Sequence, residues 1–263
     1  MMLTQYKLTM KLNRPLEVQP EMGYRLYAAL IHELPPEYGR ELHKDQVTPV
    51  SQFVKPTEKG LLWTVTLLGE ESQQVIQPVI SNHKEYLLQK DRALLTVTDC
   101  RQETLRDVDE LFERSVNMDG CRLRFETPAA FKHHGKYVNL PSERLILQSL
   151  MKKWNGVFPD CPIEDTDGEG LDAMAEGLAI RRFYLHDRIF YLKGNPIRGF
   201  MGELTVENHL KGFHRDLANA LLIFLPMPGS VSKPLWVWEL PVWSSLRWKA
   251  EKYFTAATNQ DYP

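Results

Sequence analysis

The chain has 263 residues, a formal net charge of −2, 43% hydrophobic residues and 10% aromatic residues. This composition excludes a disordered chain, and the length allows one large hydrophobic core or two smaller ones. Cys100, Cys121 and Cys161 are widely spaced and predict neither a disulfide framework nor a zinc site. Because no signal peptide or apolar run of membrane length is present, we expect a cytoplasmic protein without a membrane partner.

The first hundred residues alternate between strand and helix patterns. Residues 3–12 alternate in polarity as a half-buried strand does, and residues 23–34 place apolar side chains on one helical stripe that Pro35 and Pro36 end. After a short polar stretch, the pattern predicts strands at 47–54 and 61–68, a helix at 71–80 and a strand at 93–97. This β-α-β-β-α-β order is typical of a ferredoxin-like fold.

A helix at 104–116 is expected to link this half to a second one. The second half is predicted to contain a strand around Leu123 and Phe125, a helix at 142–154, an acidic loop at 160–176, strands at 181–192 and 196–206, a helix at 207–224, and a Trp-rich tail. We therefore predict an α+β protein with two tandem ferredoxin-like (βαββαβ) folds. The expected divisions are a domain at 1–100, a linker helix at 101–120 and a domain at 121–263.

A basic and aromatic segment runs from residue 121 to residue 155. Its positive residues have only Glu126 and Glu143 as opposing charges, and Phe131 and Trp154 lie among them. Cations neutralise a phosphate backbone and planar rings stack on bases, so this pattern indicates an RNA-binding loop. An ordinary strand, loop and helix with a solvated charged face is the alternative. The residues that we expect to contact RNA are Lys132, His133, His134, Lys136 and Tyr137.

His43 is the main candidate for catalysis. It lies in the polar stretch after the first predicted helix, where a connection can present a side chain to a ligand. Its imidazole titrates near neutral pH and can therefore move the proton of a 2′-hydroxyl or of a leaving 5′-oxygen. Tyr27, Arg40 and Lys44 are near enough in sequence to supply a phenol and positive charge to a phosphate. A surface histidine without a role is the alternative.

Two segments resemble metal sites in part, although we expect neither a metal nor a cofactor. His133 and His134 are adjacent, and neighbours on an extended chain point to opposite sides. Acidic residues within 165–176 match several positions of a calcium loop, but Pro159 and Pro162 preclude its usual entering helix. A solvated acidic loop is the better interpretation of this segment.

Glycines interrupt a predicted strand directly after Arg198, in the sequence Gly199-Phe200-Met201-Gly202. Glycines inside a strand either allow another backbone, RNA included, to approach closely or mark a β-bulge. On the first interpretation, Arg198 contacts RNA.

Three blocks of sequence together resemble the CRISPR repeat-processing endoribonucleases of the RAMP superfamily. The blocks are Gly23–Leu30 with Glu41–His43 and Pro49–Ser51, then Phe125–Phe131 with Tyr137–Pro141 and Leu145–Trp154, then Arg198–Leu204. They occur in the order that the family has, and they span most of the chain.

The resemblance implies metal-independent cleavage of a CRISPR repeat transcript, the crRNA precursor, within a pair of ferredoxin-like folds. In such chemistry a 2′-hydroxyl attacks the adjacent phosphate and leaves a 2′,3′-cyclic phosphate and a 5′-hydroxyl. His43 is similar in position to a catalytic histidine of many members, and Tyr27 to a tyrosine that some of them use. Lys44 does not have the usual lysine spacing.

The sequence departs from the family after the last long helix, where a glycine-rich loop is usual. Residues 225–234 contain several prolines and a single glycine, which leaves Ser230, Ser232 and Lys233 to contact phosphate. This departure keeps two alternatives open: a catalytically silent relative that holds repeat RNA, and a structural subunit of a CRISPR effector complex. Other CRISPR-associated proteins and a homodimer are further partners that the sequence leaves open.

Overall fold

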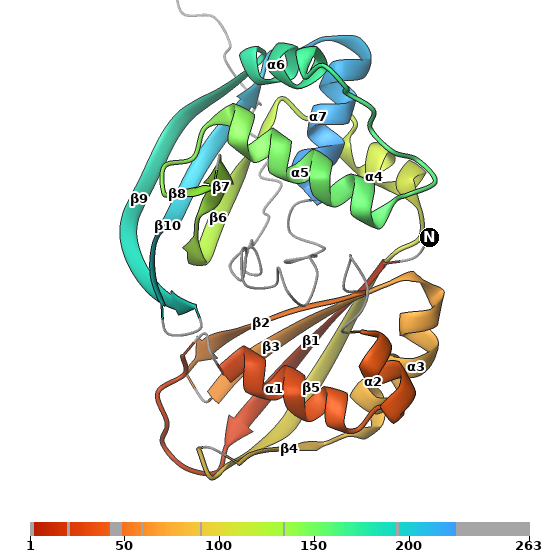
Figure 1. Ribbon diagram of the computed structural model, residues 1–263, viewed down its shortest axis with the longest axis vertical. Coiled ribbons are helices and arrows are strands. Elements are labelled where there is room, and N and C mark those ends of the chain that lie inside the picture. Colours follow the sequence, from red (N-terminus) through yellow and green to blue (C-terminus); the bar gives the residue numbers. More distant parts are fainter. Residues whose placement is uncertain are drawn as a thin grey trace, which may run out of the picture.

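The structure, a computed structural model, describes residues 3–19, 22–42, 49–58, 60–89, 91–133, 135–192 and 195–224. Within these residues the chain forms two antiparallel sheets, and helices pack against each of them (Figure 1). The first half consists of β1 (Leu3–Leu12), α1 (Met22–His32), α2 (Pro36–Glu41), β2 (Val50–Thr57), β3 (Gly60–Leu68), α3 (Gly69–Asn82), β4 (Glu85–Leu88) and β5 (Ala93–Leu105).

The first sheet has the strand order β2-β3-β1-β5-β4, in which β1 is antiparallel to both β3 and β5. Apart from the short edge strand β4, this is the strand order of a ferredoxin-like fold. Alternate residues of β1, among them Leu8 and Met10, are buried in one core together with Leu26 and Leu30 of α1 and Ile76 of α3. The period-2 pattern of β1 and the helical stripe of α1 therefore meet in the predicted core.

The second half consists of α4 (Val108–Ser115), β6 (Gly120–Ala129), β7 (Phe131–His133), β8 (Lys136–Val138), α5 (Glu143–Val157), α6 (Glu169–Glu176), β9 (Leu178–Leu192), β10 (Asn195–Asn208) and α7 (Gly212–Phe224). Its main sheet has the antiparallel order β6-β10-β9, and β7 pairs with β8 in a separate hairpin. The succession β6, α5, β9, β10, α7 and its strand order match a second ferredoxin-like unit. The α+β fold class with two tandem units is confirmed.

Two short helices occupy stretches for which the sequence predicted only connections. Pro36 starts α2, because a proline in the first turn needs no N–H and has a helical φ. The acidic loop contains α6, whose first turn is capped when the Asp165 carboxylate accepts hydrogen bonds from the Gly170 and Leu171 N–H groups, at 2.9 and 3.0 Å. Acidic residues stabilise a helix N-terminus, so the charge run promotes a helix here.

The predicted linker helix and last helix begin later than expected. β5 continues to Leu105 because it pairs with β1 as far as Leu3, so α4 starts only after the Asp107 N-cap. In the same way β10 continues to Asn208 alongside β6 and β9, and α7 begins at Gly212. In both places strand pairing with a distant segment extends the strand into residues that have helical spacing.

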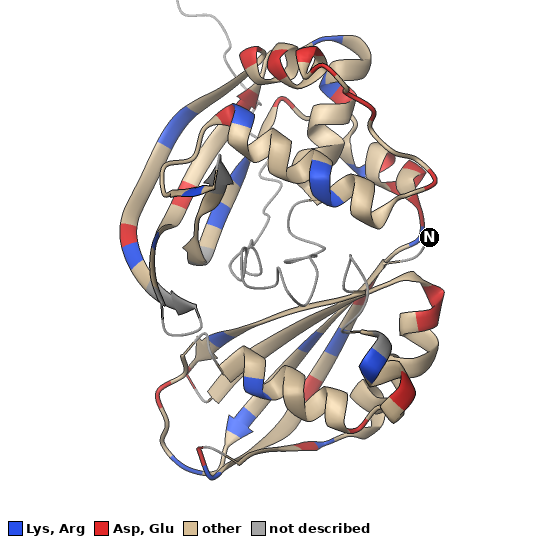
Figure 2. Ribbon diagram, viewed as in Figure 1, with Lys and Arg blue, Asp and Glu red and all other residues tan. Residues whose placement is uncertain are grey.

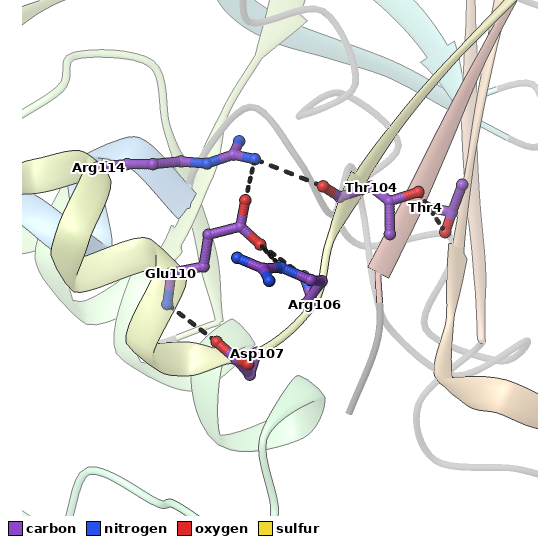
Figure 3. Close-up of polar contacts among 6 residues, drawn as sticks. All are labelled: Thr4, Thr104, Arg106, Asp107, Glu110 and Arg114. Atoms are coloured by element: carbon purple, nitrogen blue, oxygen red, sulfur yellow. Dashed lines mark hydrogen bonds and ion pairs between the residues drawn. The ribbon is translucent and has the colours of Figure 1, made fainter.

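The junction between the two halves is a compact polar cluster around Glu110 (Figure 3). The Glu110 carboxylate accepts hydrogen bonds from the backbone N–H of Arg106, at 2.9 Å, and from the side chain of Arg114. Arg114 also donates to the backbone carbonyl of Thr104 in β5, and Thr104 contacts Thr4 of β1 through their hydroxyl groups. The start of α4 is therefore fixed to the first sheet.

Candidate functional site

The helices α1 and α2 form a corner of the first half, and the chain leaves this corner toward His43. α2 packs closely on α1: a Cβ added at Gly39 would lie 3.5 Å from the Ile31 Cγ2 atom. Leu42, the residue before His43, is 2% exposed and belongs to the first core. Arg40 is exposed on α2. The last described residue before His43 is therefore anchored in the core.

Tyr27 lies half-buried in the same corner and packs against the first core. Burial, with a smaller contribution from Tyr38 of α2, raises the pKa of the Tyr27 phenol to about 12. A phenol with a raised pKa stays protonated at neutral pH, so it can donate a hydrogen bond but does not act as a base. This protonation state fits a donor to phosphate oxygen.

Several predicted site residues lie outside the described residues. These are His43, Lys44, His134, Ser230, Ser232 and Lys233. The backbones of Lys132 and His133 lie in β7, and their side chains are outside the description. Tyr27 and Arg40 share the α1–α2 corner, whereas Lys136 and Tyr137 lie in β8 of the second half.

The face of the second sheet that points away from the core is basic. Leu123 and Leu204 are directly opposite each other and buried, so their neighbours along β6 and β10 point to the other face. On that face the register places exposed side chains of β6 and β9, namely Arg122, Arg124, Arg182, Tyr184, His186 and Arg188. We refer to these six residues as the basic face (basic positions of β6 and β9 are blue in Figure 2).

The basic face combines cations with accessible rings. Tyr184 is 78% exposed, and its ring centroid lies 6.5 Å from that of His186. Arg124 pairs with Glu203 at 3.2 Å, whereas Arg182 and Arg188 form no ion pair with any residue of the described ranges. This arrangement suits a phosphate backbone with stacked bases. In the sequence, the alternation of residues 182, 184, 186 and 188 within the predicted strand 181–192 is the signal that would have placed these side chains on one face.

The β7–β8 hairpin carries the predicted RNA-binding loop on the same half. Phe131 of β7 is 2% exposed and stacks on Phe200 of β10 with ring centroids 5.8 Å apart. Lys136 and Tyr137 of β8 are exposed, Tyr137 to 39%. The hairpin is therefore attached to the core through the buried ring of β7, whereas β8 exposes a cation and an aromatic ring.

Arg198, which we predicted to contact RNA, is exposed and forms an ion pair. Its NH1 atom lies 2.9 Å from the Asp187 carboxylate of β9. The glycines after it lie opposite a β-bulge in β6: Phe200 pairs with Ala129 and Gly202 with Phe125, whereas the β9–β10 register has no shift at these positions. Gly202 has a φ of 124°. Positive φ and the closeness of the Tyr184 carbonyl require glycine there.

The described part of the chain contains no group of three or more His, Cys, Asp or Glu residues arranged to hold a metal ion. None of its helices has the length and apolar character needed to cross a membrane. Asp165 and Asp167, which matched a calcium loop, instead accept backbone hydrogen bonds at the start of α6.

A family model described as CRISPR-associated endoribonuclease Cas6 matches residues 123–229. The chain is 29% identical over 187 residues to the Cas6 endoribonuclease of Streptococcus thermophilus, which covers 70% of this chain and 76% of that protein. It is 27% identical over 212 residues to the Cas6 endoribonuclease of Mycobacterium tuberculosis, covering 77% of this chain and 66% of that protein. Over most of its length, the chain is similar to the Cas6 endoribonucleases.

The Cas6 product complex of Thermus thermophilus resembles the structure with a TM-score of 0.71 at 22% identity, over 88% of this chain and 94% of that one. At this identity the likeness concerns the fold. The segment that matches the Cas6 family model begins in β6 and contains the β7–β8 hairpin, β9, β10 and α7. It includes the basic hairpin and most of the basic face, whereas Tyr27, Arg40 and His43 lie before it.

Proposed function

We propose that this chain cleaves CRISPR repeat transcripts without a metal ion. The 2′-hydroxyl attacks the adjacent phosphorus, the bond from phosphorus to the 5′-oxygen breaks, and the products carry a 2′,3′-cyclic phosphate and a 5′-hydroxyl. The observation that carries the proposal is the Cas6 family match over residues 123–229, which contain the basic hairpin and basic strands of the second half.

His43 is proposed as the general base or acid that moves the proton of the 2′-hydroxyl or of the leaving oxygen. Two features of the α1–α2 corner support this role. The buried Leu42 anchors the chain directly before His43, and the Tyr27 phenol, with its pKa of about 12, is a protonated donor in the same α1–α2 corner as Leu42. Arg40 is exposed three residues before His43 and supplies positive charge to the developing phosphorane. Lys44 is assigned a weaker share of the same role.

Repeat RNA is proposed to bind the second half. The proposed contacts are the basic face together with Lys132, His133, His134, Lys136 and Tyr137. Arg198 contributes through its pair with Asp187, and the segment after α7 through Ser230, Ser232 and Lys233. The division into domains at 1–100 and 121–263, the cytoplasmic location, a homodimer and membership of an effector complex remain predictions from the sequence.

The test is cleavage of end-labelled repeat RNA in EDTA by the wild type, His43→Ala and His32→Ala. His32 is the matched control, because it lies at the end of α1 with a side chain 88% exposed. We expect a single cut with a cyclic phosphate end, an at least ~100-fold slower rate for His43→Ala, as for the loss of a general acid or base, and an unchanged rate for His32→Ala.

Other outcomes separate the alternatives. Cleavage that persists in His43→Ala would contradict the assignment of His43, and cleavage that EDTA abolishes would contradict the metal-independent mechanism. Tight binding of repeat RNA by the wild type without any cut would favour the silent relative that holds RNA. The proline-rich sequence of residues 225–234, where the family has a glycine-rich loop, is the observation that favours this second function.

A further inference from the structure

Asp187 bridges two elements that lie far apart in sequence. It is located in β9, and its Oδ1 atom accepts a hydrogen bond from the Asn139 side-chain amide at 3.0 Å. Its Oδ2 atom accepts one from Arg198 of β10 at 2.9 Å. Asn139 directly follows β8, so this three-residue network fastens the outer strand of the β7–β8 hairpin to the β9–β10 pair.

An apolar contact fixes the other strand of the same hairpin. Phe131 of β7 stacks on Phe200, which also makes an edge contact with Phe125 of β6 at 4.8 Å. In the register of the main sheet, Phe200 is directly opposite Asp187. The aromatic contact of β7 and the hydrogen bond next to β8 therefore involve two residues that are paired with each other in the main sheet.

Two attachments fix an orientation that one attachment leaves free. A hairpin of two short strands is not stable by itself and takes its geometry from what it packs against. Phe131 of β7 and Val138 of β8 pack against the second core, and the bond from Asn139 to Asp187 adds a directional polar attachment just after β8. Lys136 and Tyr137, which lie just before Asn139, are the residues whose position depends on it.

We infer that Asp187 is a positioning residue, which holds the basic β7–β8 hairpin in the orientation that binds repeat RNA. The inference rests on the proposed function, and it assigns to an anionic side chain a favourable effect on the binding of an anionic ligand. Arg198 then acts through Asp187 and not by direct contact with phosphate, which also explains why its guanidinium is paired.

The sign of one substitution distinguishes positioning from simple charge. Asp187→Ala removes a negative charge beside Arg188 and releases the Arg198 guanidinium, so electrostatics alone predicts tighter RNA binding. Positioning predicts weaker binding, by roughly 3- to 10-fold, the range that corresponds to the net contribution of one ordinary intramolecular hydrogen bond. Asn139→Ala breaks the same attachment without any change of charge and is expected to weaken binding equally.

The first measurement is the dissociation constant of 5′-labelled repeat RNA, together with single-turnover cleavage at saturating RNA. We expect weaker binding with an unchanged saturated cleavage rate for Asp187→Ala and Asn139→Ala. The double variant should bind RNA no more weakly than either single variant, because the two substitutions remove the same attachment. Asp172→Ala is the matched control: Asp172 is an exposed carboxylate of α6 paired with Arg144, and its loss should leave the affinity unchanged.

The second measurement does not require RNA. Amide hydrogen exchange of residues 131–133 and 136–138 should become faster in Asp187→Ala and Asn139→Ala, whereas exchange in β6 and α5 should not change. Unchanged exchange in the hairpin, or RNA binding that becomes tighter in Asp187→Ala, would overturn the inference. Failure of the wild type to bind or cut repeat RNA would instead overturn the proposed function, and the exchange result would still decide whether Asp187 holds the hairpin.

Discussion

At the scale of single residues, the hydrogen bonds at the start of α4 lower the pKa of the Glu110 carboxyl. The Arg106 backbone N–H lowers its pKa most, and the guanidinium groups of Arg114 and Arg106 add to this, so that the pKa is about 2 (Figure 3). A carboxyl whose folded pKa lies below its unfolded value of about 4.3 stabilises the fold above that value. Its contribution is lost as the pH falls from about 4.3 toward 2.

Glu110→Gln should therefore lower the free energy of unfolding at pH 7 by on the order of 1 kcal/mol, the scale of hydrogen bonds to a partly exposed charge. The difference between wild type and variant should shrink between about pH 4 and pH 2, because protonation removes the same interaction from the wild type. Urea unfolding of both proteins at pH 7 and at pH 3 measures this difference in the free energy of unfolding. Glu113→Gln is the control, because Glu113 is exposed on the same helix. An equal, pH-independent loss of the free energy of unfolding in both variants would contradict the stabilising role of Glu110.

At the scale of elements, the backbone of β10 opposite the bulge in β6 depends on Gly202. Its φ of 124° is a conformation that side chains rarely adopt, and a Cβ there would lie 2.0 Å from the Tyr184 carbonyl oxygen. We expect Gly202→Ala to lower the free energy of unfolding by at least about 2 kcal/mol. Thermal or urea unfolding monitored by circular dichroism gives the value.

Gly39→Ala is the matched control for that substitution. Gly39 lies within α2 and has room for a methyl group beside Ile31, so alanine should be neutral or stabilise the protein by about 0.5 kcal/mol. A similar loss of stability in both variants would contradict the prediction that the backbone conformation at position 202 requires glycine.

At the scale of the whole molecule, the net charge of −2 conceals an uneven distribution. Acidic residues gather at α6 and around it, whereas the basic face lies on β6 and β9 (Figure 2). Proposed binding of RNA to that face should release counterions, so affinity should fall with salt concentration in proportion to the phosphates contacted.

Arg182→Ala combined with Arg188→Ala should reduce the slope of log K against log salt by roughly 0.7 for each lost phosphate contact. Fluorescence anisotropy of labelled repeat RNA between low and moderate salt measures the slope. Arg144→Ala, which removes an arginine of α5 paired with Asp172, should leave the slope unchanged. An unchanged slope in the double variant would contradict a role of the basic face.

The sequence predicted those elements whose pattern is strong within one segment. The alternation in β1, the stripe of α1 and the Ser142 start of α5, where Ser142 accepts a hydrogen bond from the Leu145 N–H, all depend on neighbours in the chain. Predictions failed where a distant partner decided the element. β5 extends to Leu105 through its pairing with β1, and β10 extends to Asn208 through its pairing with β9.

By itself the sequence determined the α+β class, the two ferredoxin-like units and the family resemblance, because periodicity and ordered blocks of residues are properties of the chain. The tertiary structure alone decided which charged side chains share a surface. The basic face is assembled from β6 and β9, which lie on either side of β10, and the Asn139–Asp187–Arg198 network joins three separate strand regions. Such groupings depend on strand register, and register is set by the packing of the whole sheet.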